Sequence, residues 1–321
     1  MPMKSILHRS LPWLFAACLS WPAAAENPPP AAKADDAAAA RDYVRYVGDD
    51  KRGRLETVIV TMQKDGVKVE IIGAVHVADP EYYRTLTKLF TGYEELLFEL
   101  VDGQRLKEEF EGAAKRRPGS RPDAAEAGEK SIAIKLIGSM MRGVGSYFHF
   151  QYQTEGIDYH TKNFVHADVS MDEFVRLQGD RGETFTDLIR KAIEAQLELG
   201  PQRDAEPKGS QLLLALLGDS SGLKVAMARQ LAVADDLVAA MEHGGESVII
   251  SDRNKKALEV FDREVAAGRT NLALFYGAAH LGDLENRLVK RGFRRTGERW
   301  LTAWDIKPRV DALPKPAAPA E

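Results

Sequence analysis

The stretch Ile71-Ile72-Gly73-Ala74-Val75-His76-Val77-Ala78-Asp79 has a second copy late in the chain, Phe275-Tyr276-Gly277-Ala278-Ala279-His280-Leu281-Gly282-Asp283. In each copy an apolar run typical of a buried strand leads into Gly-Ala-x-His-x-x-Asp, and a helical apolar pattern follows. Each copy therefore predicts a strand, a tight turn and a helix, with the final Asp as the helix N-cap. The two histidines are expected at equivalent strand ends of one fold, facing a common site.

Glycine occupies the same position in both copies, at Gly73 and Gly277. A residue without a Cβ lets the backbone turn sharply or approach a ligand closely. We therefore expect both glycines to shape the turn that presents the histidine. Pro80 follows the first copy at a position where proline is tolerated in the first turn of a helix.

Strand and helix patterns alternate at both ends of the chain. The strand-like runs are 55–62, 67–75, 96–101, 247–251, 272–276 and 293–306, the last read as a terminal strand pair. Lys64-Asp65-Gly66 is typical of a hairpin turn, and 80–90 has helical spacing. These features predict an α/β fold with a mixed β-sheet core flanked by helices.

The middle of the chain, from about 104 to 246, predicts a large helical insertion in this core. Helical spacing is found at 171–177, 184–199 and 211–241, and the stretch 104–130 is charged without a clear period. One short β-type run, 163–165, precedes His166-Ala167-Asp168. The α/β domain with its insertion therefore spans 42–307.

The N-terminal residues 1–25 are typical of a secretory signal peptide. Lys4 and Arg9 form a basic start, a short apolar stretch follows, and Ala23-Ala24-Ala25 offers a small-residue cleavage site. We expect an exported protein, periplasmic or secreted, with an uncleaved or lipid-linked membrane anchor as the alternative. The proline- and alanine-rich segments 26–41 and 308–321 are expected to be a disordered linker and a disordered tail.

Cysteine content and charge exclude several classes of function. Cys18 is the only cysteine, so cleavage after residue 25 removes the thiol and with it any disulfide, Cys–zinc site or Cys nucleophile. The net charge of −4 without a basic stripe argues against nucleic-acid binding. No apolar run after the leader is long enough for a transmembrane helix.

Four polar residues fall in or just after strand-like runs: His76, Glu99, Arg253 and His280. Ligand sites of open α/β sheets gather at the carboxyl ends of the strands, so we expect these four residues to meet. Two neutral imidazoles and a carboxylate bind divalent transition metals and leave positions open for water or substrate. Alternatively, each histidine caps a helix or bonds a carbonyl.

Glu99 lies in the apolar run Leu96-Leu97-Phe98-Glu99-Leu100-Val101. A carboxylate there needs a cation, a metal or a proton unless it points outward at the rim of the sheet. It would serve as a metal ligand or as a general base. Arg253 would stabilise an anionic transition state or fix Glu99; alternatively it is solvated beside a capping Asp252 or Asn254. His166 and Asp168 are second-tier candidates, as is Asp252.

The order and spacing of these motifs resemble the TraB/PrgY/GumN/Tiki family over roughly residues 45–307. The resemblance rests on Gly73 to His76, Glu99 in a Phe-Glu-Leu strand, Asp252-Arg253-Asn254 and Gly277 to His280. It implies a fold similar to the erythromycin-esterase and ChaN-like group. Tiki members are described as metal-dependent peptidases with these His, Glu and Arg motifs in the site. The chain departs from the family pattern at Asp252, where Glu is expected.

The sequence as a whole predicts an exported metal-dependent hydrolase acting on peptides or a small-molecule substrate. His76, His280 and Glu99 would hold Mn²⁺, Co²⁺ or Zn²⁺, and Arg253 would support the developing oxyanion. One alternative is a non-catalytic periplasmic protein that sequesters a peptide or a haem-like ligand. Another is an assembly factor that uses its proline-rich ends and the aromatic segment 147–164 as contacts.

Overall fold

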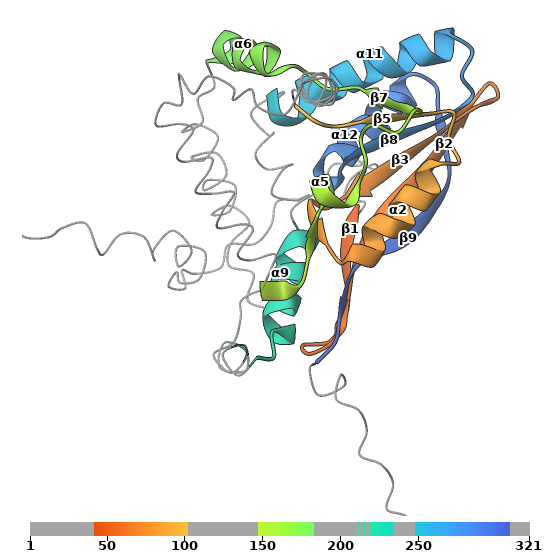
Figure 1. Ribbon diagram of the computed structural model, residues 1–321. Helices are drawn as coiled ribbons and strands as arrows, with labels where there is room; N and C mark the ends of the chain where they lie inside the picture. The colour runs from red at the N-terminus through yellow and green to blue at the C-terminus, as the bar shows by residue number, and fades with distance from the viewer. Residues whose placement is uncertain are drawn as a thin grey trace, which may run out of the picture.

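The computed structural model describes residues 42–101, 147–182, 211, 215, 218–233 and 248–308 (Figure 1). The predicted signal peptide at 1–25 and linker at 26–41 lie outside these ranges. So do the charged stretch 104–130, the helix expected at 184–199 and the tail after residue 308.

A mixed sheet of seven strands forms the core, in the order β1-β2-β3-β8-β5-β7, with β9 paired to β2. The strands are β1 (Val44–Gly48), β2 (Gly53–Lys64), β3 (Val67–Ala74), β5 (Glu95–Phe98), β7 (Phe164–His166), β8 (Asn271–Gly277) and β9 (Arg294–Ile306). The pairs that β2 makes with β1, β3 and β9 are antiparallel. The pairs β3–β8, β8–β5 and β5–β7 are parallel. The predicted α/β class with a mixed sheet is confirmed.

The predicted hairpin joins β2 to β3 through a two-residue turn. Lys64 pairs with Val67, so only Asp65 and Gly66 lie between the strands. Both have positive φ, 48° and 81°. Two consecutive positive φ values match the right-handed twist of the flanking strands, which is why Asp-Gly is favoured in such turns.

Helices cover both faces of the sheet. These are α2 (Pro80–Phe90), α11 (Arg253–Ala266) and α12 (Leu281–Lys290) (Figure 1). On one face the rings of Phe90 in α2 and Phe275 in β8 lie 4.8 Å apart. On the other face Gly73 of β3 lies against Leu281 of α12, and α11 lies beside α12. Within the described ranges no helix is both long and apolar enough to cross a membrane.

The predicted helical insertion is only partly helical. Its described part contains α5 (Gln153–Gly156), α6 (Met171–Arg181) and α9 (Ser221–Ala232). It also contains β7, which forms the sheet edge beyond β5, and β6 (Gln151–Tyr152), which pairs with β4 (Val77–Ala78) in a second small sheet. Residues 148–167 therefore contribute side chains to the core, and residues 151–153 lie beside the loop that carries His76.

Two strand predictions near the C-terminus are wrong. The predicted strand at 247–251 is replaced by a π-helix, η1 (Val248–Asp252), which continues directly into α11. A short apolar run has the same appearance in a buried strand and in a buried helix start. The run 293–306 is one long strand, β9, because it follows β2 along its whole length and absorbs two register shifts instead of turning back.

The structure places Asp79, but not Asp283, at the predicted N-cap position. Asp79 occupies the N-cap position of α2, but its carboxylate accepts from the backbone N of Asp305 (2.6 Å) instead of capping the helix. Asp283 lies inside the first turn of α12, whose N-cap is His280. The second copy starts its helix earlier because the short 3-10 turn η2 (Ala278–His280) follows β8 directly.

Candidate functional site

Four neighbouring parallel strands deliver four polar side chains to one edge of the sheet. His76 follows β3, His280 follows β8, Glu99 follows β5 and Asp168 follows β7. Because the strands are parallel, their carboxyl ends meet at the same edge, where ligands of open α/β sheets bind. The structure thus brings the motif histidines and Glu99 to the same edge of the sheet.

The two motif copies are offset by one residue in the sheet. Ala74 pairs with Gly277, and Gly73 pairs with Tyr276. Side chains alternate between the faces of a strand, so a one-residue offset places the two glycines on opposite faces. The histidines also differ, with His76 exposed in a loop and His280 4% exposed at the end of η2.

The absence of a side chain at Gly277 lets three polar side chains approach its backbone. A Cβ at this position would lie 3.3 Å from Glu99 Oε2, 3.7 Å from His280 Cδ2 and 3.8 Å from His76 Nε2. Neither motif glycine has a positive φ, so their role is close approach and not an unusual backbone conformation. At Gly73 a Cβ would instead meet Leu281 Cδ2 and Val58 O, both at 3.1 Å, which makes Gly73 a packing glycine.

Glu99 points inward, and the outward orientation considered from the sequence is wrong. Its Oε1 accepts from Arg253 Nη2 (2.6 Å) and its Oε2 accepts from the backbone N of Gly277 (2.6 Å). Burial acts to raise the pKa of Glu99, but the neighbouring imidazoles, the charge of Arg253 and the Gly277 N–H outweigh it and lower the pKa to about 2. Glu99 is therefore an ionised carboxylate and a weak base.

Arg253 is the first residue of α11 and is buried. Its Nε donates to Asp168 Oδ1 (3.0 Å) and its Nη2 donates to Asp168 Oδ2 (2.6 Å) as well as to Glu99. Burial acts to lower the pKa of Arg253, but Asp168 and Glu99 outweigh it and raise the pKa above its ordinary value. Arg253 thus joins the buried Asp168 to the partly buried Glu99, and the solvated arginine considered from the sequence is wrong. It is delivered by η1 and not by a strand end.

Asn254 fixes the tautomer of His280. The Nδ2 of Asn254 donates to the backbone O of His280 (3.1 Å) and to Asp283 Oδ2 (2.9 Å). The Oδ1 atom therefore faces His280 Nδ1 at 2.7 Å, so Nδ1 must carry the proton that it donates. Burial lowers the pKa of His280, against the opposing charge of Glu99. The imidazole is neutral, with the Nε2 lone pair 3.5 Å from Glu99 Oε1.

The second-tier residues divide between the site and the scaffold. Asp168 belongs to the site because it holds Arg253. The Nε2–H of His166 donates to the backbone O of Leu100 (2.7 Å), which anchors the chain just after Glu99. Asp252 accepts two hydrogen bonds from Arg181 (2.8 and 2.9 Å) and ties α6 to η1. Neither His166 nor Asp252 lines the pocket.

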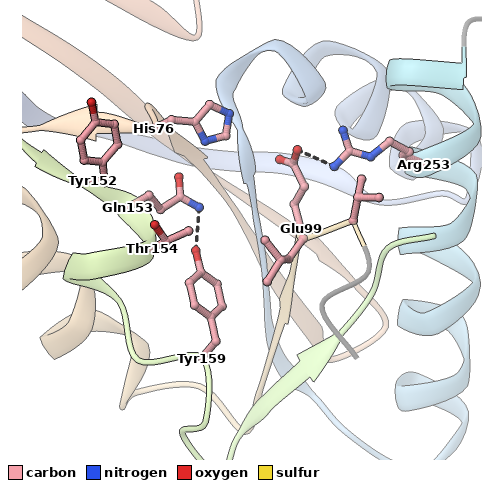
Figure 2. Close-up of a pocket in the computed structure, with 9 residues that line it drawn as sticks. His76, Glu99, Tyr152, Gln153, Thr154, Tyr159 and Arg253 are labelled. Carbon is pink, nitrogen blue, oxygen red and sulfur yellow. Dashed lines mark hydrogen bonds and ion pairs between the residues drawn. The ribbon is translucent and has the colours of Figure 1, made fainter. Parts of the chain in front are cut away.

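A pocket of about 180 Å³ opens beside Glu99 and Arg253. Figure 2 shows Glu99 and Arg253 on one side, Gln153 and Tyr159 on the other, and His76 near the top of the gap. The further lining residues are Leu100, Val101, Tyr152 and Thr154. The wall formed by 152–159 was not predicted as part of the site, because its aromatic and polar residues have no motif spacing.

Two of the three predicted metal ligands stand together. His280 Nε2 and Glu99 Oε1 are adjacent, while His76 is exposed at the pocket. In the part of the chain that the structure describes, no three His, Cys, Asp or Glu side chains are already grouped as ligands of one metal ion. An imidazole lone pair facing an ionised carboxylate is nevertheless a donor set that suits a divalent transition metal.

Comparison of the chain with protein-family models, with curated proteins and with solved structures finds no match. The geometry of the pocket is therefore the basis on which a function is assigned below.

Proposed function

We propose that this protein is an exported metal-dependent hydrolase of the TraB/GumN/Tiki type that acts on peptides. The observation that carries the proposal is the contact between His280 and Glu99. The carboxylate of Glu99, which accepts from Arg253 and from the Gly277 N–H, lies 3.5 Å from Nε2 of His280, whose proton is held on Nδ1 by Asn254. Two electron-pair donors held this close in a buried site repel each other unless a cation lies between them.

The net charge of the buried cluster also favours a bound cation. Glu99 and Asp168 are carboxylates, and Arg253 is the guanidinium that pairs with both. With His280 neutral, these buried groups carry one more negative than positive charge. A divalent cation such as Mn²⁺, Co²⁺ or Zn²⁺ would offset that excess.

We assign three residues to the ion: His280 through Nε2, Glu99 through its carboxylate and His76. The first two are held in place by Asn254, Arg253 and Gly277. His76 is exposed, and an exposed side chain changes rotamer readily. Such an ion, when bound, supplies a water of lowered pKa and polarises the carbonyl that is attacked.

The remaining roles follow from hydrogen bonding and from charge. With a pKa of about 2, Glu99 is a poor proton acceptor, so we assign it as a ligand and not as the general base. Arg253 donates to both buried carboxylates. We therefore assign Arg253 to holding Glu99 in place in preference to stabilising an oxyanion.

Membership of the TraB/PrgY/GumN/Tiki family, with a fold of the ChaN and erythromycin-esterase type, is part of the same proposal. It is supported by the positions of the residues that carry the resemblance. His76, Glu99 and His280 surround Gly277, and Arg253 lines the pocket together with His76 and Glu99. Export to the periplasm or the exterior is supported by the leader-like residues 1–25.

The proposal is tested by incubating the protein with a peptide library before and after chelation and after metal is added back. We expect hydrolysis that stops with the chelator and returns with Mn²⁺, Co²⁺ or Zn²⁺. His280→Ala should reduce the rate at least ~100-fold, since losing a ligand costs more than losing its supporting residue. His160→Ala, which changes an exposed histidine away from the pocket, is the control. Peptide binding without turnover, insensitive to the chelator, would instead favour a sequestering protein.

A further inference from the structure

The wall of the pocket opposite Glu99 carries buried polar atoms that no protein group satisfies. Among the described residues, Gln153 Oε1 and Tyr152 Oη are buried without a hydrogen-bond partner. Gln153 is only 7% exposed, and both residues line the pocket. Leaving a buried acceptor without a hydrogen bond is unfavourable, so a ligand that donates to it would be stabilised there.

Gln153 is held by one backbone and one side-chain hydrogen bond. Its backbone N donates to the carbonyl of His76 (2.9 Å), and its side-chain Nε2 donates to Tyr159 Oη (2.8 Å) (Figure 2). The pairing of Tyr152 with Val77 in the small sheet holds this segment beside His76. With Nε2 bonded to Tyr159, the Oε1 atom is the acceptor of this side chain that has no protein partner.

Tyr159 supplies the complementary donor. Its Oη accepts from Gln153, which leaves its own O–H to donate. Burial raises the pKa of Tyr159 to about 12, so the hydroxyl keeps its proton. The ring is held against Phe98 at 5.0 Å between centroids, next to the strand end that carries Glu99. One acceptor and one donor thus lie side by side across the pocket from Glu99.

We infer that Gln153 and Tyr159 form a subsite that binds the main chain of an extended peptide residue, with Gln153 Oε1 accepting its N–H and the Tyr159 O–H donating to its C=O. In an extended chain the N–H and C=O of one residue point to the same side, and main-chain pairing of this kind recognises peptides independently of their side chains. The inference rests on the proposed function, because it deepens the assignment of a peptide substrate to the same pocket.

The test is an N-methyl scan of the best peptide from the library. Each N-methylation removes one main-chain N–H. In the wild type, methylation of one residue should raise KM about three- to tenfold, the value of one hydrogen bond. In Gln153→Leu the unmodified peptide should show the same rise in KM, and methylation at that residue should have no further effect. Bound metal should be unchanged in Gln153→Leu.

Two further variants test the donor separately and control for the loss of a buried glutamine. Tyr159→Phe removes only the donor and should also raise KM without loss of bound metal. Gln211→Leu changes a buried glutamine elsewhere, beside Gly222, and should leave the N-methyl effect intact. An equal N-methyl effect in the wild type and Gln153→Leu would overturn the inference, as would a normal KM in Gln153→Leu.

Failure of the proposed function is seen separately, as the absence of chelator-sensitive turnover. In that case the effect of N-methylation is measured on binding, by fluorescence anisotropy of the labelled library peptides. Loss of N-methyl discrimination in Gln153→Leu would still support the subsite. Absence of peptide binding, or discrimination unaffected by the substitution, would overturn it.

Discussion

His280 Nε2 lies 3.5 Å from Glu99 Oε1, although the two residues follow different strands of the sheet. β8 and β5 are parallel neighbours, so their carboxyl ends bring a buried imidazole and a buried carboxylate together. Asn254 holds the proton of His280 on Nδ1, and Gly277 and Arg253 hold the carboxylate. The surrounding residues thus leave one lone pair and one negative charge facing each other.

Replacing Asn254 with Asp should move the acid limb of the pH–rate profile to higher pH. Burial lowers the pKa of His280 below its ordinary 6.5, so the wild-type limb is expected below that pH. A carboxylate beside Nδ1–H stabilises the imidazolium and should raise its pKa by about 1 unit. Asn163→Asp, where the amide donates to the carbonyls of Phe90 and Tyr93, is the control. An unchanged limb in Asn254→Asp would show that His280 is not the titrating group.

Asp168→Asn and Asp252→Asn form a matched pair, because each carboxylate is bonded by an arginine through two nitrogens. Both substitutions should lower the free energy of unfolding, since each weakens the ion pair of a buried carboxylate. Only Asp168→Asn should weaken metal binding, by about 10- to 100-fold, because its arginine supports a ligand. Competition with a chromophoric chelator measures this affinity. Equal affinities in the two variants would remove Asp168 from the site.

Gly277→Ala and Gly73→Ala should separate activity from stability. A Cβ on Gly277 meets Glu99 Oε2 at 3.3 Å, so alanine displaces the carboxylate and should reduce activity about tenfold or more. A Cβ on Gly73 meets Val58 O and Leu281 Cδ2 at 3.1 Å, which should cost about 1–3 kcal/mol of stability while the folded fraction keeps its activity. Thermal melts and specific activity of both variants decide this. Loss of activity in Gly73→Ala, with loss of stability alone in Gly277→Ala, would contradict the different roles assigned to the two glycines.

Glu70 provides a test of the scaffold away from the pocket. It pairs with Arg299 (2.6 Å) and Lys68 (3.0 Å) and accepts from the hydroxyl of Tyr93. Burial acts to raise the pKa of Glu70, but these three groups outweigh it and lower the pKa from 4.5 to about 2. A lowered folded-state pKa stabilises the fold above pH 4.5, and that contribution is lost as the pH falls towards 2.

Glu70→Gln should therefore lower the free energy of unfolding at pH 7 by about 1–3 kcal/mol, the smaller values reflecting solvent screening of the half-exposed Arg299. Denaturant titrations at pH 7 and at pH 3 measure the difference between variant and wild type. The difference should shrink at the lower pH. A difference that stays constant with pH would mean that the ion pair does not stabilise the fold.

Much of the sheet and part of the site follow from local sequence pattern. The apolar runs before His76 and His280 predict their strands, and the carboxyl-end rule places both histidines and Glu99 at one edge. Glu99 stands out because a lone carboxylate among apolar residues requires a partner. These features depend on residues that are close together in the sequence, so they can be predicted from a single sequence.

Other features depend on pairing that sequence pattern does not encode. β3 and β8 pair with a one-residue offset between the two motifs, and one histidine is exposed while the other is buried, although their motifs are the same. The π-helix η1 resembles a strand in composition, and it carries the chain directly to Arg253. Gln153 and Tyr159 reach the pocket only because β6 pairs with β4. Each of these was missed because a tertiary contact decided it.

The most direct test is an anomalous diffraction map from crystals soaked in Co²⁺ or Zn²⁺. We predict one strong peak bonded to His280 Nε2 and the Glu99 carboxylate, with the ring of His76 turned towards it, and no such peak in Glu99→Gln. Glu285→Gln, which removes the charge of another buried, arginine-paired carboxylate, should keep the peak. The absence of any peak between His280 and Glu99 at saturating metal, with both side chains unmoved, would contradict the assignment of this pocket as a metal site.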